Sequence, residues 1–140
     1  MYKINLYSVG KNKEAWLEDA LALYQKRMQK QVQLHFSWVK SSELLLKALQ
    51  KENQVFCFDP KGDTLTSEAF AKTLEKGLIE GGSQVALVIG EAHGLTQELK
   101  KFPLISLSKM IFTHQLTRLV VAEQIYRAVQ IWNNSPYHFS

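Results

Sequence analysis

The sequence Gln84-Val85-Ala86-Leu87-Val88-Ile89-Gly90 places five apolar side chains in a row between a glutamine and a glycine. Because no polar residue interrupts this run, it does not have the alternation of a strand with one face in water. Short uninterrupted runs are typical of strands that are buried on both faces, as in parallel sheets covered by helices. Residues 84–89 therefore predict a buried strand that ends at Gly90.

The segments on either side of this strand alternate between strand-like and helix-like patterns. Residues 54–58 form a second apolar run, whereas residues 32–38 alternate apolar and polar side chains as a half-buried strand does. Strands are predicted at residues 2–9, 32–38, 54–58, 84–89 and 105–108. Helices are predicted at residues 13–30, 41–51, 66–80, 96–101 and 114–132. This order predicts a single α/β domain over residues 1–140, with a mostly parallel sheet and helices on both faces.

Composition narrows the class of protein. The chain has 140 residues, 46% of them hydrophobic, which is enough for the core of one ordinary domain. Its apolar runs fall well short of the roughly 20 residues that a membrane-spanning helix needs, and the N-terminus lacks a signal-peptide pattern. The single cysteine, Cys57, predicts a buried thiol without a disulfide. We therefore expect a cytoplasmic protein without a membrane partner. The net charge of +4 fits a polyanionic partner without requiring one.

Familiar nucleotide- and metal-binding patterns are absent from the sequence. There is no G-x-G-x-x-G after the first strand, no P-loop pattern and no metal-ligand spacing of Cys and His, so no metal is expected. Ligands of parallel sheets bind at the carboxyl ends of the strands. These ends are predicted at Gly10, at a turn over residues 59–62, and at residues 90–94 and 108–113. The glycines of residues 90–94 permit close approach of a ligand, although an ordinary strand-to-helix turn has the same composition.

The helix predicted at residues 114–132 is apolar around most of its girth, which indicates burial, in part by a second subunit. Glu123 and Arg127 are four residues apart and can form an ion pair. Arg118 falls within the apolar arc, where a guanidinium needs a carboxylate, carbonyl groups or an anionic substrate. Beyond the helix, Tyr137 and His138 can stack on a splayed base, unless they belong to a frayed end.

Several short motifs, taken together, match a known family. They are Ile89-Gly90, Gly94-Leu95, Ser106-Leu107-Ser108, His114-Gln115-Leu116 with Arg118, Glu123-Gln124, Tyr126-Arg127-Ala128 and Pro136-Tyr137-His138. In this order and spacing, the chain resembles SPOUT methyltransferases of the RlmH type, which methylate N3 of a pseudouridine in 23S ribosomal RNA. The resemblance covers essentially the whole chain. It departs at one point, where the family usually has Ile-Gly-Gly and this chain has Ile89-Gly90-Glu91.

The resemblance implies a C-terminal trefoil knot, a homodimer, and S-adenosylmethionine bound in the knot mainly by main-chain groups. By matching position, the cofactor-binding residues are Phe58, Gly90, Leu107, Ser108, Lys109, Met110, Ile111 and Phe112. Catalytic roles are expected for His114, Arg118, Tyr137 and His138. Arg118 is expected to bind a phosphate or the base carbonyl, and the two tail residues to hold the target base. The implied substrate is 23S ribosomal RNA, free or within the ribosome.

Two other classes of function stay open. A protein with this fold can serve as an RNA-binding or assembly factor without catalysis, and tight binding of S-adenosylmethionine would count against that role. A flavodoxin-like signalling or nucleotide-binding domain has a similar order of elements. It is disfavoured because Asp59 is the only carboxylate at the end of a buried strand and the terminal helix is long and apolar.

Overall fold

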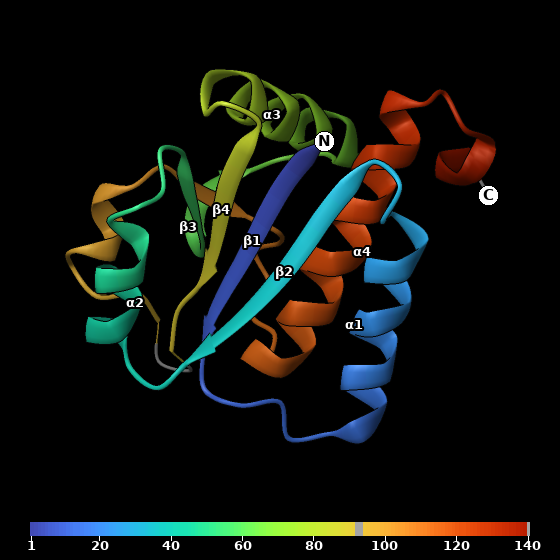
Figure 1. The fold of residues 1–140 in the computed structure, drawn as a ribbon. Helices are drawn as coiled ribbons and strands as arrows, with labels where there is room; N and C mark the ends of the chain where they lie inside the picture. Colours follow the sequence, from blue (N-terminus) through green and yellow to red (C-terminus); the bar gives the residue numbers. More distant parts are fainter. Residues whose placement is uncertain (92–93, 140) are drawn as a thin grey trace.

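A computed structural model describes residues 1–91 and 94–139 of the chain. In this part, five strands form one sheet in the order β2-β1-β4-β3-β5, and every neighbouring pair is parallel. The strands are β1 (Tyr2–Val9), β2 (Val32–Val39), β3 (Val55–Thr64), β4 (Gln84–Ile89) and β5 (Leu104–Ser106). The helices are α1 (Ala15–Arg27), α2 (Ser42–Leu49), α3 (Ser67–Glu80) and α4 (His114–Trp132), with short 3-10 helices η1 (Leu99–Lys101) and η2 (Pro136–Phe139). The predicted parallel α/β architecture is confirmed (Figure 1).

Strand β4 lies between β1 and β3 and is buried on both faces, as its sequence predicts. Val85, Leu87 and Ile89 join one core with residues of α3 and α4. Ala86 and Val88 join a second core with residues of α2 and η1 on the opposite face. Helices therefore cover both faces of the sheet, as expected.

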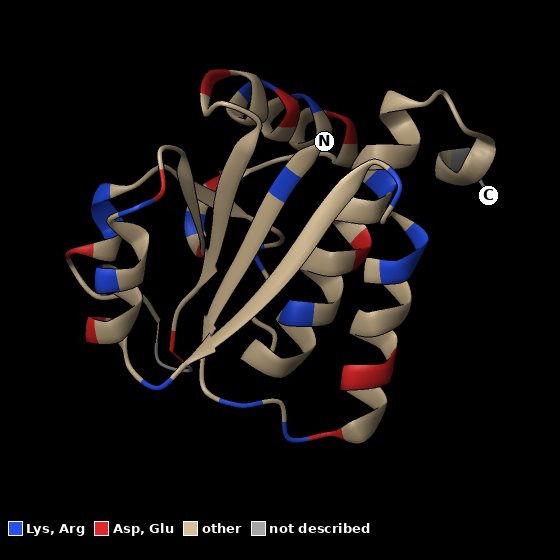
Figure 2. Cartoon of the chain, viewed as in Figure 1, with Lys and Arg blue, Asp and Glu red and all other residues tan. Residues whose placement is uncertain are grey.

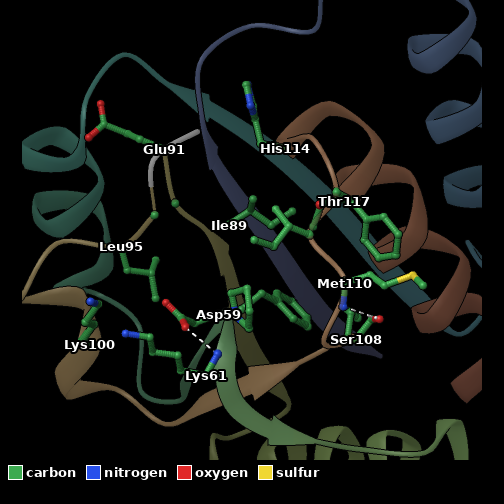
Figure 3. Close-up of a pocket in the computed structure, with 17 residues that line it drawn as sticks. Asp59, Lys61, Ile89, Glu91, Leu95, Lys100, Ser108, Met110, His114 and Thr117 are labelled. Carbon is green, nitrogen blue, oxygen red and sulfur yellow. Dashed lines mark hydrogen bonds between the residues drawn. The ribbon is translucent and has the colours of Figure 1, made fainter.

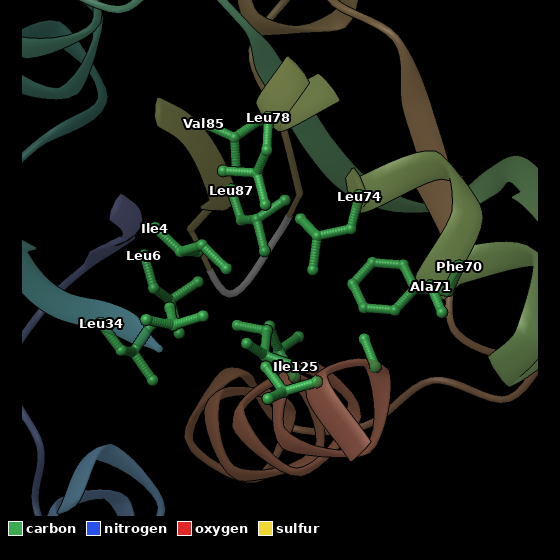
Figure 4. Packing of buried hydrophobic residues seen from close by; sticks show 14 of the residues in the cluster. Ile4, Leu6, Leu34, Phe70, Ala71, Leu74, Leu78, Val85, Leu87 and Ile125 are labelled. Atoms are coloured by element: carbon green, nitrogen blue, oxygen red, sulfur yellow. The ribbon is translucent and has the colours of Figure 1, made fainter. Parts of the chain in front are cut away.

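Helix α4 fills the space between the sheet, α1 and α3. Thr113 caps its N-terminus, where the hydroxyl oxygen accepts a hydrogen bond from the main chain of Leu116. Ile125 points from α4 toward Leu6 of β1 and Leu74 of α3 (Figure 4). The face turned to the sheet is closely packed, and it carries the buried Arg118 among apolar residues.

The predicted turn at residues 59–62 is wrong, because β3 continues through it to Thr64. The pairing of β3 with β5 shifts register between Phe58 and Asp63, so the extra residues form an irregularity within the strand. A Cβ atom at Gly62 would lie 2.6 Å from the main-chain carbon of Leu104. Glycine thus permits this close pairing, and the pairing outweighs the local turn preference of the sequence.

Other boundaries also differ from the predictions. The helix predicted at 96–101 is only η1, the helix predicted at 13–30 is shortened to α1, and the tail is folded into η2. The strand predicted at 105–108 ends at Ser106, whose hydroxyl donates to the Ser108 carbonyl oxygen at 2.9 Å and stabilises a turn. The expected trefoil knot depends on chain threading, which strand order does not test, and stays a prediction. Ala92 and His93 of the predicted glycine-bounded loop lie outside the described residues.

Candidate functional site

A cavity of about 420 Å³ lies at the carboxyl end of β4 and beside the middle of β3, and it is closed by the segment between β5 and α4 (Figure 3). This volume falls in the range of about 300–1,000 Å³ that is typical of small-molecule sites. Seven of the eight expected cofactor residues line it: Phe58, Gly90, Leu107, Ser108, Met110, Ile111 and Phe112. Lys109 is exposed and does not line it. The structure therefore brings nearly the whole expected set together.

The segment of residues 108–112 presents main-chain groups as well as side chains. Within residues 1–91 and 94–139, its main chain makes no hydrogen bond to other main-chain groups. Serine hydroxyls bond the Ser108 carbonyl oxygen and the Met110 N–H, and the other N–H and C=O groups of the segment are available to a ligand. The Ser108 hydroxyl accepts from the Met110 N–H at 3.0 Å and shapes this segment. Such an arrangement suits a ligand with an aromatic ring and polar edges, because apolar walls enclose the ring and main-chain groups bind its edges.

Gly90 is required by its own loop. A Cβ atom there would lie 2.7 Å from Cδ2 of Leu95 and 3.0 Å from the carbonyl oxygen of Gly94. Glu91 replaces the family's second glycine without strain, because it is not among the described residues with positive φ. Its carboxylate accepts a hydrogen bond from the Ser42 hydroxyl at 2.9 Å, which ties the cavity loop to the start of α2.

Arg118 is fully buried beside the end of β1. Its four hydrogen bonds run from Nε to Ser8 Oγ at 2.9 Å, from Nη1 to Asn12 Oδ1 at 2.7 Å, and from Nη2 to the carbonyl oxygens of Val9 at 3.0 Å and Gly10 at 2.8 Å. The guanidinium also lies 4.2 Å from the centre of the Trp38 ring. Burial lowers the pKa of Arg118 to about 10, so the side chain stays charged at neutral pH. The sequence left a carboxylate, carbonyl groups or an anionic substrate open as partners of Arg118, and the structure shows carbonyl groups. Arg118 does not line the cavity, and it joins α4 to the loop after β1.

His114 begins α4 and lines the cavity. Burial lowers the pKa of His114, and the positive charges of Arg118 and Lys13 lower it further. The side-chain amide of Gln115 donates to Nε2 of His114 at 3.1 Å and to the Lys11 carbonyl oxygen at 2.8 Å. The imidazole is thus neutral at neutral pH and held in place against the loop after β1.

Tyr137 and His138 do not line the cavity. Glu123 and Arg127 form the predicted ion pair at 3.2 Å, and the Tyr137 hydroxyl donates to Glu123 at 3.1 Å. His138 contacts both Arg127 and Glu68. Glu123 lies nine residues beyond His114 along α4, which corresponds to about 14 Å of helix. Within the chain, the tail residues and the cavity residues therefore form two separate groups.

The structure adds cavity residues that the sequence analysis did not assign. Asp59 and Lys61 lie in the segment that was taken for a turn, and Lys100 belongs to η1. The first two follow the strand predicted at residues 54–58, and the predicted end of a buried strand is a usable signal. Lys100 has no such signal, since it reaches the cavity from a connecting segment.

Two further sequence predictions concern burial and ions. Cys57 is buried, as predicted. Burial raises the pKa of its thiol to about 12, with a smaller contribution from the negative charge of Asp59.

Across the described residues, no group of three or more His, Cys, Asp or Glu side chains is placed to hold a metal ion. The same residues include no helix long and apolar enough to cross a membrane. Basic and acidic side chains are interspersed over the helices and loops (Figure 2).

Comparison with known proteins adds independent findings. A family model described as "Predicted SPOUT methyltransferase" matches residues 2–138. The chain is 52% identical over 139 residues to the ribosomal RNA large subunit methyltransferase H of Protochlamydia amoebophila, with 99% of each chain covered. It is 36% identical over 158 residues to the protein of the same name from Natranaerobius thermophilus, covering 98% of this chain and 99% of the relative. The crystal structure of TrmJ from Z. mobilis superposes with a TM-score of 0.54 at 11% identity, over 91% of this chain and 69% of that one, and so shares the fold.

Proposed function

The chain belongs to the SPOUT methyltransferase family, and we propose that it transfers a methyl group from S-adenosylmethionine to N3 of a pseudouridine in 23S ribosomal RNA. The observation that carries the proposal is the cavity lined by residues 107–108 and 110–112, in a chain similar over its whole length to large-subunit ribosomal RNA methyltransferases. An enzyme with this substrate acts in the cytoplasm, on free 23S ribosomal RNA or on the ribosome.

The cavity fits the proposed cofactor. Phe58, Leu107 and Phe112 supply apolar walls for the adenine ring, and the main chain of residues 108–112 supplies donors and acceptors for its edge. Gly90 also lines the cavity, and the loop that follows it packs too closely for a Cβ atom at this position. When bound, S-adenosylmethionine supplies an activated methyl group on its sulfonium, whose carbon–sulfur bond breaks as the new carbon–nitrogen bond forms.

The chain's own residues have to align the base and help N3 to lose its proton. His114 is the proposed residue for the second task, because it lines the cavity and its lowered pKa keeps the imidazole neutral. To accept the proton, Nε2 of His114 has to give up the hydrogen bond from the Gln115 amide. Arg118 donates its hydrogen bonds to β1 and the following loop. These contacts favour a supporting role, in which Arg118 holds the start of α4 at the cavity, over the direct phosphate or carbonyl contact expected from the sequence.

The tail residues require a second protomer in this proposal. Tyr137 and His138 contact α4 near Glu123 and Arg127, away from the cavity of their own chain. Met110, Ile111 and Leu116 are exposed apolar side chains around the start of α4, which favours a homodimer that covers this region. In such a dimer, the tail of one protomer can hold the target base above the cavity of the other.

Calorimetric titration with S-adenosylmethionine tests the proposal at its first step. We expect saturable binding of one molecule per protomer in the absence of RNA. A purified, folded protein that releases no heat and shows no thermal stabilisation at millimolar S-adenosylmethionine would instead favour a non-catalytic RNA-binding role.

A further inference from the structure

The cavity has an apolar body and one end with charges of both signs, while the Glu91 carboxylate lines it elsewhere and accepts a hydrogen bond from the Ser42 hydroxyl. Asp59 and Lys61 reach this end from β3, and Lys100 reaches it from η1, next to the apolar Leu95 (Figure 3). Ser108 and Met110 lie on the other side of the cavity. The two lysines are far apart in the sequence, so the fold, not the local chain, brings them together.

The charges at this end are not neutralised by the protein. Neither Lys61 nor Lys100 forms an ion pair with any described residue. The Asp59 carboxylate accepts, through Oδ1, a hydrogen bond from the main-chain N–H of Lys61 at 2.8 Å. Two ammonium groups and one carboxylate are therefore available to a ligand that carries both a negative and a positive charge.

We propose that Lys61 and Lys100 bind the α-carboxylate of S-adenosylmethionine and that Asp59 binds its α-ammonium group. The inference rests on the proposed function. It assigns the amino-acid end of the cofactor to three residues that are not among the cofactor-binding residues implied by the family resemblance. A zwitterionic amino-acid group matches a mixed-charge end, and the adenosine portion matches the apolar walls. Lys61, Lys100 and Asp59 are in this account specificity-determining residues for the amino-acid portion of the cofactor.

An RNA phosphate could also bind two lysines, since it shares the anionic chemistry of a carboxylate. The position of Asp59 favours the cofactor, because a carboxylate beside the lysines repels a phosphate but pairs with an ammonium group. Both lysines also line the cavity that receives the adenosine portion, so the anion they bind belongs with the occupant of that cavity.

The test compares three ligands by calorimetry with the full chain. S-adenosylmethionine and S-adenosylhomocysteine both carry the amino-acid portion, whereas 5′-methylthioadenosine keeps the adenosine and lacks that portion. Lys61→Gln and Lys100→Gln are each expected to weaken binding of the first two ligands about tenfold, as for the loss of one hydrogen bond to a charged group. Affinity for 5′-methylthioadenosine should change less than about twofold, a difference of about 0.4 kcal/mol.

Lys101→Gln is the matched control, because Lys101 is the next residue of η1, is exposed and does not line the cavity. It should leave all three affinities unchanged. Asp59→Asn keeps the acceptor for the Lys61 N–H and should weaken the two amino-acid ligands while sparing 5′-methylthioadenosine.

Three results would overturn the inference. Equal weakening of all three ligands would mean that the lysines support the cavity generally. Unchanged affinities, together with a raised KM for ribosomes and a weaker salt dependence, would assign the lysines to RNA phosphate. If the wild-type chain bound neither S-adenosylmethionine nor 5′-methylthioadenosine, the proposed function itself would fail, and this inference with it.

Discussion

Replacing Arg118 by methionine should destabilise the protein strongly. The guanidinium is fully buried and donates four hydrogen bonds to β1, Asn12 and the loop after β1. Methionine fills much of the space but leaves these acceptors without a partner. Each buried acceptor left without a donor costs about 1–3 kcal/mol, and the loss of several donors at once is expected to cost about 3–5 kcal/mol in total. For a chain of 140 residues, this corresponds to a fall in Tm of about 10–17 °C.

Urea unfolding, followed by tryptophan fluorescence at one fixed protein concentration, measures the effect. Arg27→Met is the control, because Arg27 is exposed near the end of α1 and its guanidinium lies 5.9 Å from the Tyr24 ring centre. It should cost less than about 1 kcal/mol. A loss of less than about 1 kcal/mol for Arg118→Met, with an unchanged m-value, would refute the view that Arg118 anchors α4.

Four further outcomes are expected. Gly90→Val should abolish binding of S-adenosylmethionine, since its Cβ collides with Leu95 and Gly94 and displaces the cavity loop; unchanged affinity in the folded variant would disprove the placement. The imidazole of His114 should titrate by NMR with a midpoint below its ordinary value of 6.5. Because its folded-state pKa is lowered, its contribution to stability is complete above pH 6.5 and decreases as the pH falls through that value. Ile111→Asp should give monomers in light scattering, whereas Ile79→Asp, at a similarly exposed isoleucine of α3, should not; dimers of both variants would exclude this interface. Deleting residues 136–140 should abolish methylation but spare cofactor binding, and mixing with Gly90→Val should restore part of the activity; a fully active deletion variant would leave the tail without a role.

The sequence predicted the elements that are determined by burial. The observed bounds of β4 and α4 match the predicted ones. An uninterrupted apolar run identified the strand, and apolar residues around most of the circumference identified the helix, because both patterns are typical of elements surrounded by protein. The turn predicted at residues 59–62 was wrong because its composition is local, whereas the pairing of β3 with β5 joins segments about 40 residues apart.

Part of the candidate site was also predictable from the sequence. The predicted strand ends gave residues 90–94 and 108–113, and the family resemblance gave Gly90 and residues 107–112; all of this last set except Lys109 line the cavity. The partners of Arg118 were not predictable, since the residues that accept its hydrogen bonds lie more than 100 positions earlier in the chain. The sequence indicated that a buried guanidinium needs partners, and only the fold identifies them.

The central claim is methylation of a pseudouridine in 23S ribosomal RNA. Its most direct test incubates the purified protein and S-adenosylmethionine with ribosomes from cells that lack this modification, then digests the 23S ribosomal RNA to nucleosides for mass spectrometry. The account predicts 3-methylpseudouridine in the wild-type reaction and none with Gly90→Val. Ribosomes that gain no methylated nucleoside, from a protein shown to bind S-adenosylmethionine, would contradict it.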